Sequence, residues 1–305
     1  MDVAKLETPV FVVGCPRSGT TLLQRMLNQH SQIAIASETH FIWRFWRQRA
    51  TYGDLQQDAH YQRLIEDIVA MPEFAEMQLN TTEFTAQAWT LPRCYRNLLS
   101  LLLVSFAQRQ TATVTGEKTP DHLRFLDVLQ QFYPAARFIH VVRDPRAVVN
   151  SWKTVPWSRG SVKEDAKIWR NNLRQYRAYP ATVHKATLIV AYEQLVTEPT
   201  TVLQRICEFL QLNFEADMLA YHSQSPTAIS LQREPWKKNI VRPVDPALVQ
   251  RWQQQLTPAE VGTIELFTLS ELWRWGYRPQ SSPWRLAKLA VATLQAKFQA
   301  SVQAK

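Results

Sequence analysis

Two stretches of the sequence combine residues whose types and spacing suit phosphate binding. The first, residues 14–21, reads GCPRSGTT; it follows a short apolar run and precedes leucines at helical spacing, which predicts a strand, a loop and a helix. Such a loop directs backbone N–H groups and the positive end of a helix at one spot, and its glycines allow an anion to approach closely. We therefore predict that a phosphate is held by Arg17, Ser18, Gly19, Thr20 and Thr21.

The second stretch, residues 143–151, reads RDPRAVVNS and follows the apolar run 136–142. Arg143 ends the predicted strand and Ser151 lies in the second turn of the next helix, so both could meet one phosphate over the start of that helix. Alternatively, Arg143 pairs with Asp144 or caps the sheet. Two separate phosphate sites indicate a nucleotide that carries phosphates at both ends of its ribose.

The first loop departs from the loop of nucleoside triphosphatases. It keeps two glycines separated by four residues, but Thr20 stands where those enzymes have a lysine, and the basic residue is Arg17. In such enzymes that lysine and a magnesium ion bind the β- and γ-phosphates and neutralise their charge. The sequence offers no clear acidic residue at a strand end to bind the metal. A P-loop kinase or nucleotide hydrolase is therefore the alternative function, and we expect phosphate binding without a metal.

The elements that must position these residues alternate along the chain. Short apolar runs alternate with segments whose apolar residues recur at helical spacing. This alternation predicts an α/β fold, a P-loop-type parallel sheet with helices on both faces. Residues 41–110 are helical in pattern and rich in aromatic residues, which indicates an α-helical insertion. We expect one domain over residues 1–280 and a basic amphipathic helix over residues 281–305. The predicted strands cover residues 10–14, 33–36, 111–115, 136–142 and 187–191.

Charge and cysteine usage narrow the class of protein. The 305 residues carry a net charge of +9, which suits an anionic ligand, an acidic substrate or a negatively charged surface. Apart from the C-terminal tail, the basic residues are scattered along the sequence and are not gathered into one arm. We therefore expect no nucleic-acid partner. The three cysteines have no metal-ligand spacing, which favours a reduced compartment. The first residues do not resemble a signal peptide and the apolar run 98–106 is too short to span a bilayer, so we expect a cytoplasmic protein.

The C-terminal tail is basic. From Leu272 to the end the sequence has six basic residues and no acidic one, and Leu286, Leu294, Phe298 and Val302 are expected on one helical face. This pattern fits a helix that contacts a membrane surface or a partner, and it also fits a soluble terminal helix. A non-catalytic nucleotide-binding protein held at a membrane by this tail is the second alternative function.

The two phosphate stretches resemble those of a known enzyme family. Residues 15–23 resemble the 5′-phosphosulfate loop of sulfotransferases that use 3′-phosphoadenosine 5′-phosphosulfate (PAPS), and residues 143–151 resemble their 3′-phosphate motif. The likeness is to tyrosylprotein sulfotransferases and related bacterial enzymes. It implies in-line transfer of a sulfuryl group from PAPS to an acceptor hydroxyl or amine, with 3′-phosphoadenosine 5′-phosphate as product and no metal. Small-molecule, carbohydrate, lipid and peptide acceptors stay open, as does a homodimer.

The resemblance also implies roles for single residues. Glu38, in the segment SET, would act as general base. Alternatively, its carboxylate forms an ion pair or lies at a helix N-terminus. His40 is a second candidate base. Lys118, in the segment EKTP, and Arg17 would neutralise charge on the leaving phosphate. The segment WKK stands where family members place a serine near the 5′ end of the cofactor. Further cofactor contacts are implied for Tyr192, Trp236, Lys237, Lys238 and Arg242.

Overall fold

The computed structural model describes residues 2–156, 158, 160–223 and 242–303. The chain divides into two compact units. The sheet unit comprises Met1–Val142 and Tyr179–Val244, and the helical unit comprises Arg143–Ala178 and Asp245–Lys305. The chain passes from the first unit to the second directly after a strand, at Arg143.

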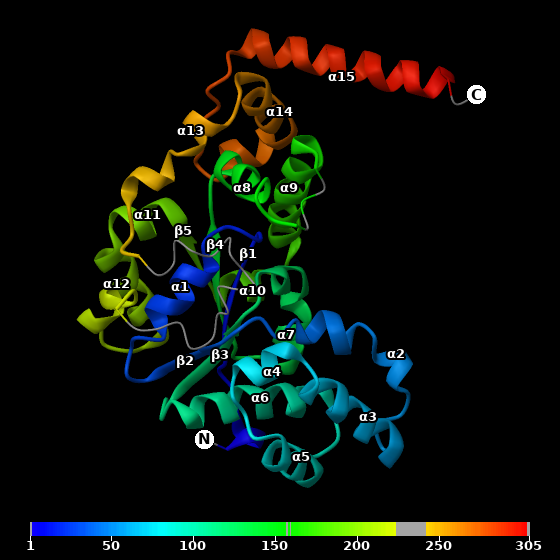
Figure 1. The fold of residues 1–305 in the computed structure, drawn as a ribbon, viewed down its shortest axis with the longest axis vertical. Helices are drawn as coiled ribbons and strands as arrows, with labels where there is room; N and C mark the ends of the chain where they lie inside the picture. The colour runs from blue at the N-terminus through cyan, green and yellow to red at the C-terminus, as the bar shows by residue number, and fades with distance from the viewer. Residues whose placement is uncertain (1, 157, 159, 224–241, 304–305) are drawn as a thin grey trace. The chain divides into compact units, whose positions relative to one another are not determined.

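The sheet unit is built on five parallel strands in the order β2-β3-β1-β4-β5 (Figure 1). Strand β1 lies in the centre, paired with β3 on one side and β4 on the other. All five residues of β1 are buried, as expected for a parallel strand covered on both faces. The strands are β1 (Val10–Gly14), β2 (Ile33–Ala36), β3 (Val114–Lys118), β4 (Arg137–Val142) and β5 (Thr187–Ala191).

Helices flank both faces of this sheet, so the predicted P-loop-type α/β fold is confirmed. Helix α1 (Thr20–Leu27) packs on β1, β2 and β3, and helix α6 (Tyr95–Arg109) packs on β2 and β3. The crossover through α1 runs from β1 to β2, and the crossover that contains α6 runs back from β2 to β3. Because parallel crossovers are right-handed, crossovers in opposite directions lie on opposite faces.

The position of β3 differs from the prediction of a strand at residues 111–115. The strand runs Val114–Lys118 and includes a glycine and two charged residues that an apolar pattern does not mark. Gly116 pairs with Val10, and a Cβ at position 116 would lie 1.8 Å from the Val10 carbonyl oxygen. The absence of a side chain therefore allows β3 to continue beside β1 as far as Lys118.

Residues 41–110 form helical turns and helices, the last of which is α6 (Figure 1). Aromatic residues pack within this segment and against its neighbours: the Trp46 ring lies 5.5 Å from the Tyr95 ring and 5.0 Å from the Phe132 ring. Burial of large aromatic surfaces stabilises this segment without a sheet. Its other elements are the π-helical turn η2 (Ile42–Trp46) and α2 (Arg49–Tyr52), α3 (Asp58–Val69), α4 (Pro72–Glu76) and α5 (Thr81–Thr90).

Short helical elements complete the sheet unit. The 3₁₀ helix η3 follows β3 and contacts β1, and helix α11 follows β5 directly. The remaining elements are η1 (Val3–Lys5), η3 (Pro120–Phe125), α7 (Leu126–Phe132), α10 (Ala181–Lys185), α11 (Tyr192–Thr197), α12 (Pro199–Leu210) and η4 (Ala216–Ala220).

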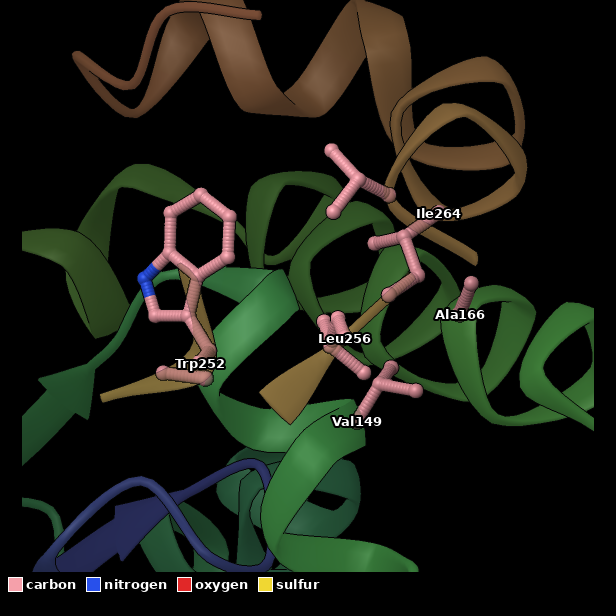
Figure 2. Close-up of a cluster of buried hydrophobic side chains, with 7 residues drawn as sticks. Val149, Ala166, Trp252, Leu256 and Ile264 are labelled. Atoms are coloured by element: carbon pink, nitrogen blue, oxygen red, sulfur yellow. The ribbon is translucent and has the colours of Figure 1, made fainter. Parts of the chain in front are cut away.

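The helical unit has its own apolar core (Figure 2). Val149, Ala166 and Ile264 are fully buried there, beside Trp252 and Leu256. These residues come from segments far apart in the sequence, so the core holds the two parts of the unit together. Its elements are α8 (Pro145–Trp152), α9 (Val162–Ala178), η6 (Pro246–Val249), α13 (Trp252–Gln255), α14 (Pro258–Arg274) and α15 (Pro283–Gln303). Within the described part of the chain, no helix has both the length and the apolar character needed to cross a membrane.

Candidate functional site

The loop between β1 and α1 has the backbone geometry of an anion cradle. Arg17 has φ = 73° and Gly19 has φ = 97°, both in the left-handed region. The Ser18 N–H donates to the Cys15 carbonyl at 3.0 Å, which closes a tight turn. No side chain caps the start of α1, where Gly19 is the N-cap residue. The first N–H groups of a helix lack intrahelical acceptors, so they are directed at a ligand placed over this end.

Two glycines allow neighbouring strands and rings to approach the loop. A Cβ on Gly14 would lie 2.5 Å from the Val141 carbonyl oxygen, and a Cβ on Gly19 would lie 2.2 Å from the Tyr192 ring. The Tyr192 ring therefore lies directly against the loop. The structure thus brings Tyr192, at the start of α11, together with the loop at the carboxyl edge of the sheet.

The loop contains a buried hydroxyl group that could donate a hydrogen bond to a ligand oxygen. Ser18 is fully buried, and its Oγ has no hydrogen-bond partner among the residues that the structure describes. A buried hydroxyl without a partner costs free energy, and a phosphate oxygen over the loop would remove that cost. Thr20 is buried, whereas Arg17 and Thr21 are partly exposed. The loop therefore combines N–H groups and a hydroxyl that could hold an anion such as phosphate.

An ion pair joins two of the predicted catalytic residues. Lys118 lies at the end of β3 opposite Val12 of β1, and its side chain is 1% exposed. Its Nζ donates to Oε1 of Glu38, whose side chain is 26% exposed. A buried ammonium needs a compensating charge, and Glu38 provides it from the loop after β2. The carboxylate is thus held at the carboxyl edge of the sheet, the edge that carries the loop between β1 and α1.

His40 lies on the other side of the same carboxylate. Its Nε2 is 3.4 Å from Oε2 of Glu38. Burial lowers the pKa of His40 below its ordinary value, although the charge of Glu38 acts in the opposite direction. A neutral imidazole therefore predominates at neutral pH, and it can accept or relay a proton beside Glu38.

A buried cluster behind this pair was missed by the sequence analysis. Glu117 is fully buried and accepts a hydrogen bond from Thr39, and its Oε1 lies 2.5 Å from Nδ1 of His122. Burial alone would raise the pKa of Glu117, but the interactions with His122 and Thr39 outweigh it and hold the pKa below its ordinary value. Thr39 and His122 therefore offset the cost of burying the Glu117 carboxylate.

The same cluster fixes the backbone that carries Glu38 and His40. The Phe41 N–H donates to Thr39 Oγ1 at 3.0 Å, and the Ile42 N–H donates to His122 Nε2 at 3.3 Å. Successive residues of a strand face opposite sides, so Lys118 faces Glu38 while Glu117 faces this cluster. In the sequence, these cluster residues are marked only by their position, since Thr39 and Glu117 are each next to a predicted catalytic residue.

The predicted 3′-phosphate residues lie in the helical unit. Arg143 directly follows β4 and is half-buried, and its carbonyl accepts a hydrogen bond of 3.0 Å from the indole N–H of Trp169. Ser151 is half-buried in the last turn of α8. Asp144 caps α8, since its carboxylate accepts from the Arg146 N–H at 2.8 Å.

Arg146, the second arginine of the motif, organises the helical unit. Its guanidinium donates to Asp144 at 2.7 Å and to Glu265 at 2.7 Å. Burial would lower the pKa of Arg146, but the two carboxylates outweigh it and raise that pKa. Glu265 also accepts from the N–H groups of Gln280 and Ser281, at 2.7 and 2.8 Å. Arg146 therefore ties α8 to α14 and to the segment that leads into α15.

The segment with the predicted cofactor contacts at residues 236–242 is described only in part. Arg242 is exposed, and its carbonyl accepts a hydrogen bond of 2.6 Å from the hydroxyl of Tyr221. The Tyr221 carbonyl in turn accepts from Arg25 of α1 at 2.9 Å, which links this segment to the helix behind the phosphate loop. Trp236, Lys237 and Lys238 lie outside the described residues.

A family model described as "Sulfotransferase family" matches residues 9–216 of the chain. The match contains the phosphate loop, Glu38, Lys118, Arg143 and Ser151. Protein-tyrosine sulfotransferase A of Caenorhabditis elegans is 25% identical over 292 residues, which cover 90% of this chain and 68% of the relative. Protein-tyrosine sulfotransferase 1 of Danio rerio is 24% identical over 283 residues, which cover 90% of this chain and 73% of the relative.

Two solved structures share the fold. The sulfotransferase domain from the Synechococcus PCC 7002 olefin synthase superposes with a TM-score of 0.62 at 24% identity, and the alignment covers 90% of this chain and 97% of that domain. The sulfotransferase domain from the curacin biosynthetic pathway superposes with a TM-score of 0.60 at 19% identity, over 90% of this chain and 99% of that domain.

Proposed function

The chain belongs to the sulfotransferase family, and on that premise we propose that it transfers a sulfuryl group from PAPS to an acceptor hydroxyl or, alternatively, an amine. The observation that carries the proposal is the ion pair between Glu38 and Lys118 at the edge of the sheet that bears the phosphate loop. A carboxylate next to a buried cation at a phosphate loop combines a proton acceptor with charge stabilisation for a leaving phosphate.

The contacts proposed for the donor come from separate motifs of the chain. The loop N–H groups, the Ser18 hydroxyl and Arg17 suit its 5′ end, and Arg143 and Ser151 suit its 3′-phosphate by their place in the family motif. PAPS supplies a sulfuryl group attached to a phosphate that leaves readily. The other proposed contacts are Gly19, Thr20, Thr21, Tyr192, Trp236, Lys237, Lys238 and Arg242.

Glu38 is proposed as the general base. Its ion pair with Lys118 favours the ionised carboxylate, and its partial exposure leaves it reachable from solvent. Glu38 would take the proton of the acceptor hydroxyl, while Lys118 and Arg17 neutralise the negative charge that grows on the leaving phosphate. His40, 3.4 Å from Glu38, is the second candidate base.

A tyrosyl peptide is the first acceptor to examine, because the relatives described above are named as protein-tyrosine sulfotransferases. Their identity to this chain is 25% or less, so carbohydrate, lipid and small phenolic acceptors belong in the same trial. Incubation with ³⁵S-labelled PAPS, first with tyrosine-containing peptides and then with a cell extract, would identify the labelled product.

The proposal is tested with two variants, Glu38→Gln and His40→Gln, whose positions lie two residues apart. We expect Glu38→Gln to keep its affinity for 3′-phosphoadenosine 5′-phosphate within a few-fold and to lose roughly 100-fold or more of its turnover, the usual contribution of a general base. We expect His40→Gln to retain most of its turnover. Isothermal titration calorimetry and ³⁵S transfer give the two quantities, with circular dichroism as the folding control.

Each alternative predicts a different result. Normal turnover by Glu38→Gln contradicts the base assignment. Tight ATP binding that depends on magnesium, with no binding of the 3′,5′-bisphosphate, indicates a kinase or nucleotide hydrolase. Bisphosphate binding without transfer to any acceptor in an extract indicates a non-catalytic nucleotide-binding protein.

A further inference from the structure

Helix α15 exposes an apolar stripe. Trp284, Val291 and Leu294 are 73%, 53% and 65% exposed, and their spacing of seven and three residues places them on one side of the helix. Leu286, which the sequence analysis expected on the same face as Leu294, is instead buried. The solvent-exposed side of a surface helix is usually polar. This stripe is instead apolar, so it is available to bind a surface.

The inner face of α15 is already used within the helical unit. Helix α15 packs on α14, and a Cβ on Gly262 of α14 would lie 2.7 Å from Cδ1 of Leu289. Leu289 therefore contacts α14. The exposed stripe is a second apolar face, separate from the contacts that hold α15 in place.

The segment that carries this stripe is positively charged. Six basic residues and no acidic residue follow Glu271, and Arg274, Arg278 and Lys288 are exposed. The carboxylates of α14 are engaged elsewhere in the helical unit, because Glu260 pairs with Lys153, Glu265 with Arg146 and Glu271 with Arg177. The cations of this segment are therefore available to an anionic surface.

Two exposed tryptophans lie beside these cations. The Lys288 Nζ lies 5.4 Å from the Trp284 ring, and the Arg278 guanidinium lies 4.3 Å from the Trp273 ring. Tryptophan and long basic side chains are enriched where protein meets the headgroup region of a bilayer, since each has an apolar body and a polar end.

We propose that α15 lies in the interface of an anionic lipid bilayer. Trp284, Val291 and Leu294 enter the boundary between headgroups and acyl chains, and Lys288 and Arg278 contact the headgroup phosphates. A second copy of the chain is the less suitable occupant, because a two-fold contact through α15 places the cations of one copy against those of the other. The proposal concerns binding to a surface and is independent of the sulfuryl transfer.

Co-sedimentation of the full chain with vesicles tests the proposal. We expect the chain to sediment with vesicles that contain about one third phosphatidylglycerol in phosphatidylcholine at about 0.1 M salt, and to be released at about 0.5 M salt as the charges are screened. Pure phosphatidylcholine vesicles should bind it at least roughly tenfold more weakly, because several basic side chains each contribute to binding.

Matched variants on α15 separate the stripe from the rest of the helix. Trp284→Ala combined with Leu294→Gln should lower the partition coefficient roughly tenfold or more, since large apolar side chains supply the insertion energy. Lys288→Glu should also weaken binding to the anionic vesicles. Ala292→Gln, an exposed position outside the stripe, should leave the partition coefficient unchanged.

Three results would overturn the proposal. One is the absence of binding to anionic vesicles, and another is equal binding to neutral and anionic vesicles. The third is a stable dimer in sedimentation velocity without lipid that Leu294→Gln dissociates, which would assign the stripe to a second copy of the chain.

Discussion

The buried ammonium of Lys118 donates a hydrogen bond to the partly exposed carboxylate of Glu38, from 80 residues away in the sequence. The pair is asymmetric, because the lysine side chain is 1% exposed and the glutamate side chain 26%. Water can reach the carboxylate if the lysine is removed, but it cannot easily reach the ammonium if the carboxylate is removed. The two residues therefore contribute differently to the stability of the fold.

Glu38→Gln should lower the free energy of unfolding more than Lys118→Met does. Glutamine can still accept a hydrogen bond from Lys118 but does not compensate the buried positive charge, and this loss costs on the order of 3 kcal/mol. Lys118→Met keeps the buried stem and leaves an accessible carboxylate, so we expect a loss of about 1 kcal/mol. Urea denaturation at pH 7 measures both values, and equal losses, or a larger loss for Lys118→Met, would contradict the asymmetry.

Ser18→Ala should separate ligand binding from stability. The Ser18 hydroxyl is buried without a hydrogen-bond partner in the described structure, so its removal should leave the free energy of unfolding unchanged or slightly higher. The affinity for 3′-phosphoadenosine 5′-phosphate should fall about tenfold or more, because a hydrogen bond to a charged group contributes about 1.5–3 kcal/mol. Denaturation and titration calorimetry measure the two effects.

Thr115→Val is the matched control for this change. The Thr115 hydroxyl is also buried but donates to the Leu103 carbonyl at 2.7 Å, so its loss should lower stability by about 1 kcal/mol and leave nucleotide affinity unchanged. Unaltered nucleotide affinity in Ser18→Ala would remove that hydroxyl from the phosphate site.

Gly19→Ala should destabilise the loop through two separate effects. The backbone of Gly19 has φ = 97°, and an added Cβ would overlap the Tyr192 ring. We expect the variant to lose about 2 kcal/mol or more in the free energy of unfolding and to bind the bisphosphate poorly. In a Tyr192→Ala background the overlap is gone and only the backbone strain remains.

A double-mutant cycle tests this contact. The cost of Gly19→Ala should be smaller in the Tyr192→Ala background by about 0.5–3 kcal/mol, the range expected for residues in contact. Strictly additive effects would show that the Tyr192 ring does not lie against the loop.

His140 should make the protein sensitive to mild acid. It lies in β4 beside Val13 of β1 and is fully buried, and burial lowers the pKa of His140 to about 3. The unfolded chain binds this proton near the ordinary pKa of about 6.5, so stability falls as the pH drops from about 6.5 towards 3. At pH 5 the loss is about 2 kcal/mol relative to pH 7, by the same proton linkage.

His140→Leu should remove this contribution. The difference in unfolding free energy between pH 7 and pH 5 should then shrink by about 2 kcal/mol relative to the unaltered chain, as measured by urea denaturation at each pH. An unchanged pH dependence would indicate that His140 is protonated in the folded state at pH 5.

Local sequence was sufficient to predict the turn between the first strand and the first helix, and the class of fold. The order of strand, glycine-rich turn and helix depends on neighbouring residues, because turn geometry and helix starts are set within a few positions. The parallel sheet followed from the alternation of apolar runs with helical segments, and the structure confirms it. The family resemblance then pointed to Glu38 and Lys118 as separate candidates.

Only the tertiary structure decided what these residues contact. The register of β3 against β1 and the position of the loop after β2 bring Glu38 to Lys118, and they bury Glu117 with Thr39 and His122. Likewise, Leu286 is buried and Leu294 is exposed, although the sequence pattern predicted both on one face. Such contacts depend on strand order and on which face a neighbour covers, and these are properties of the whole chain that no local spacing encodes.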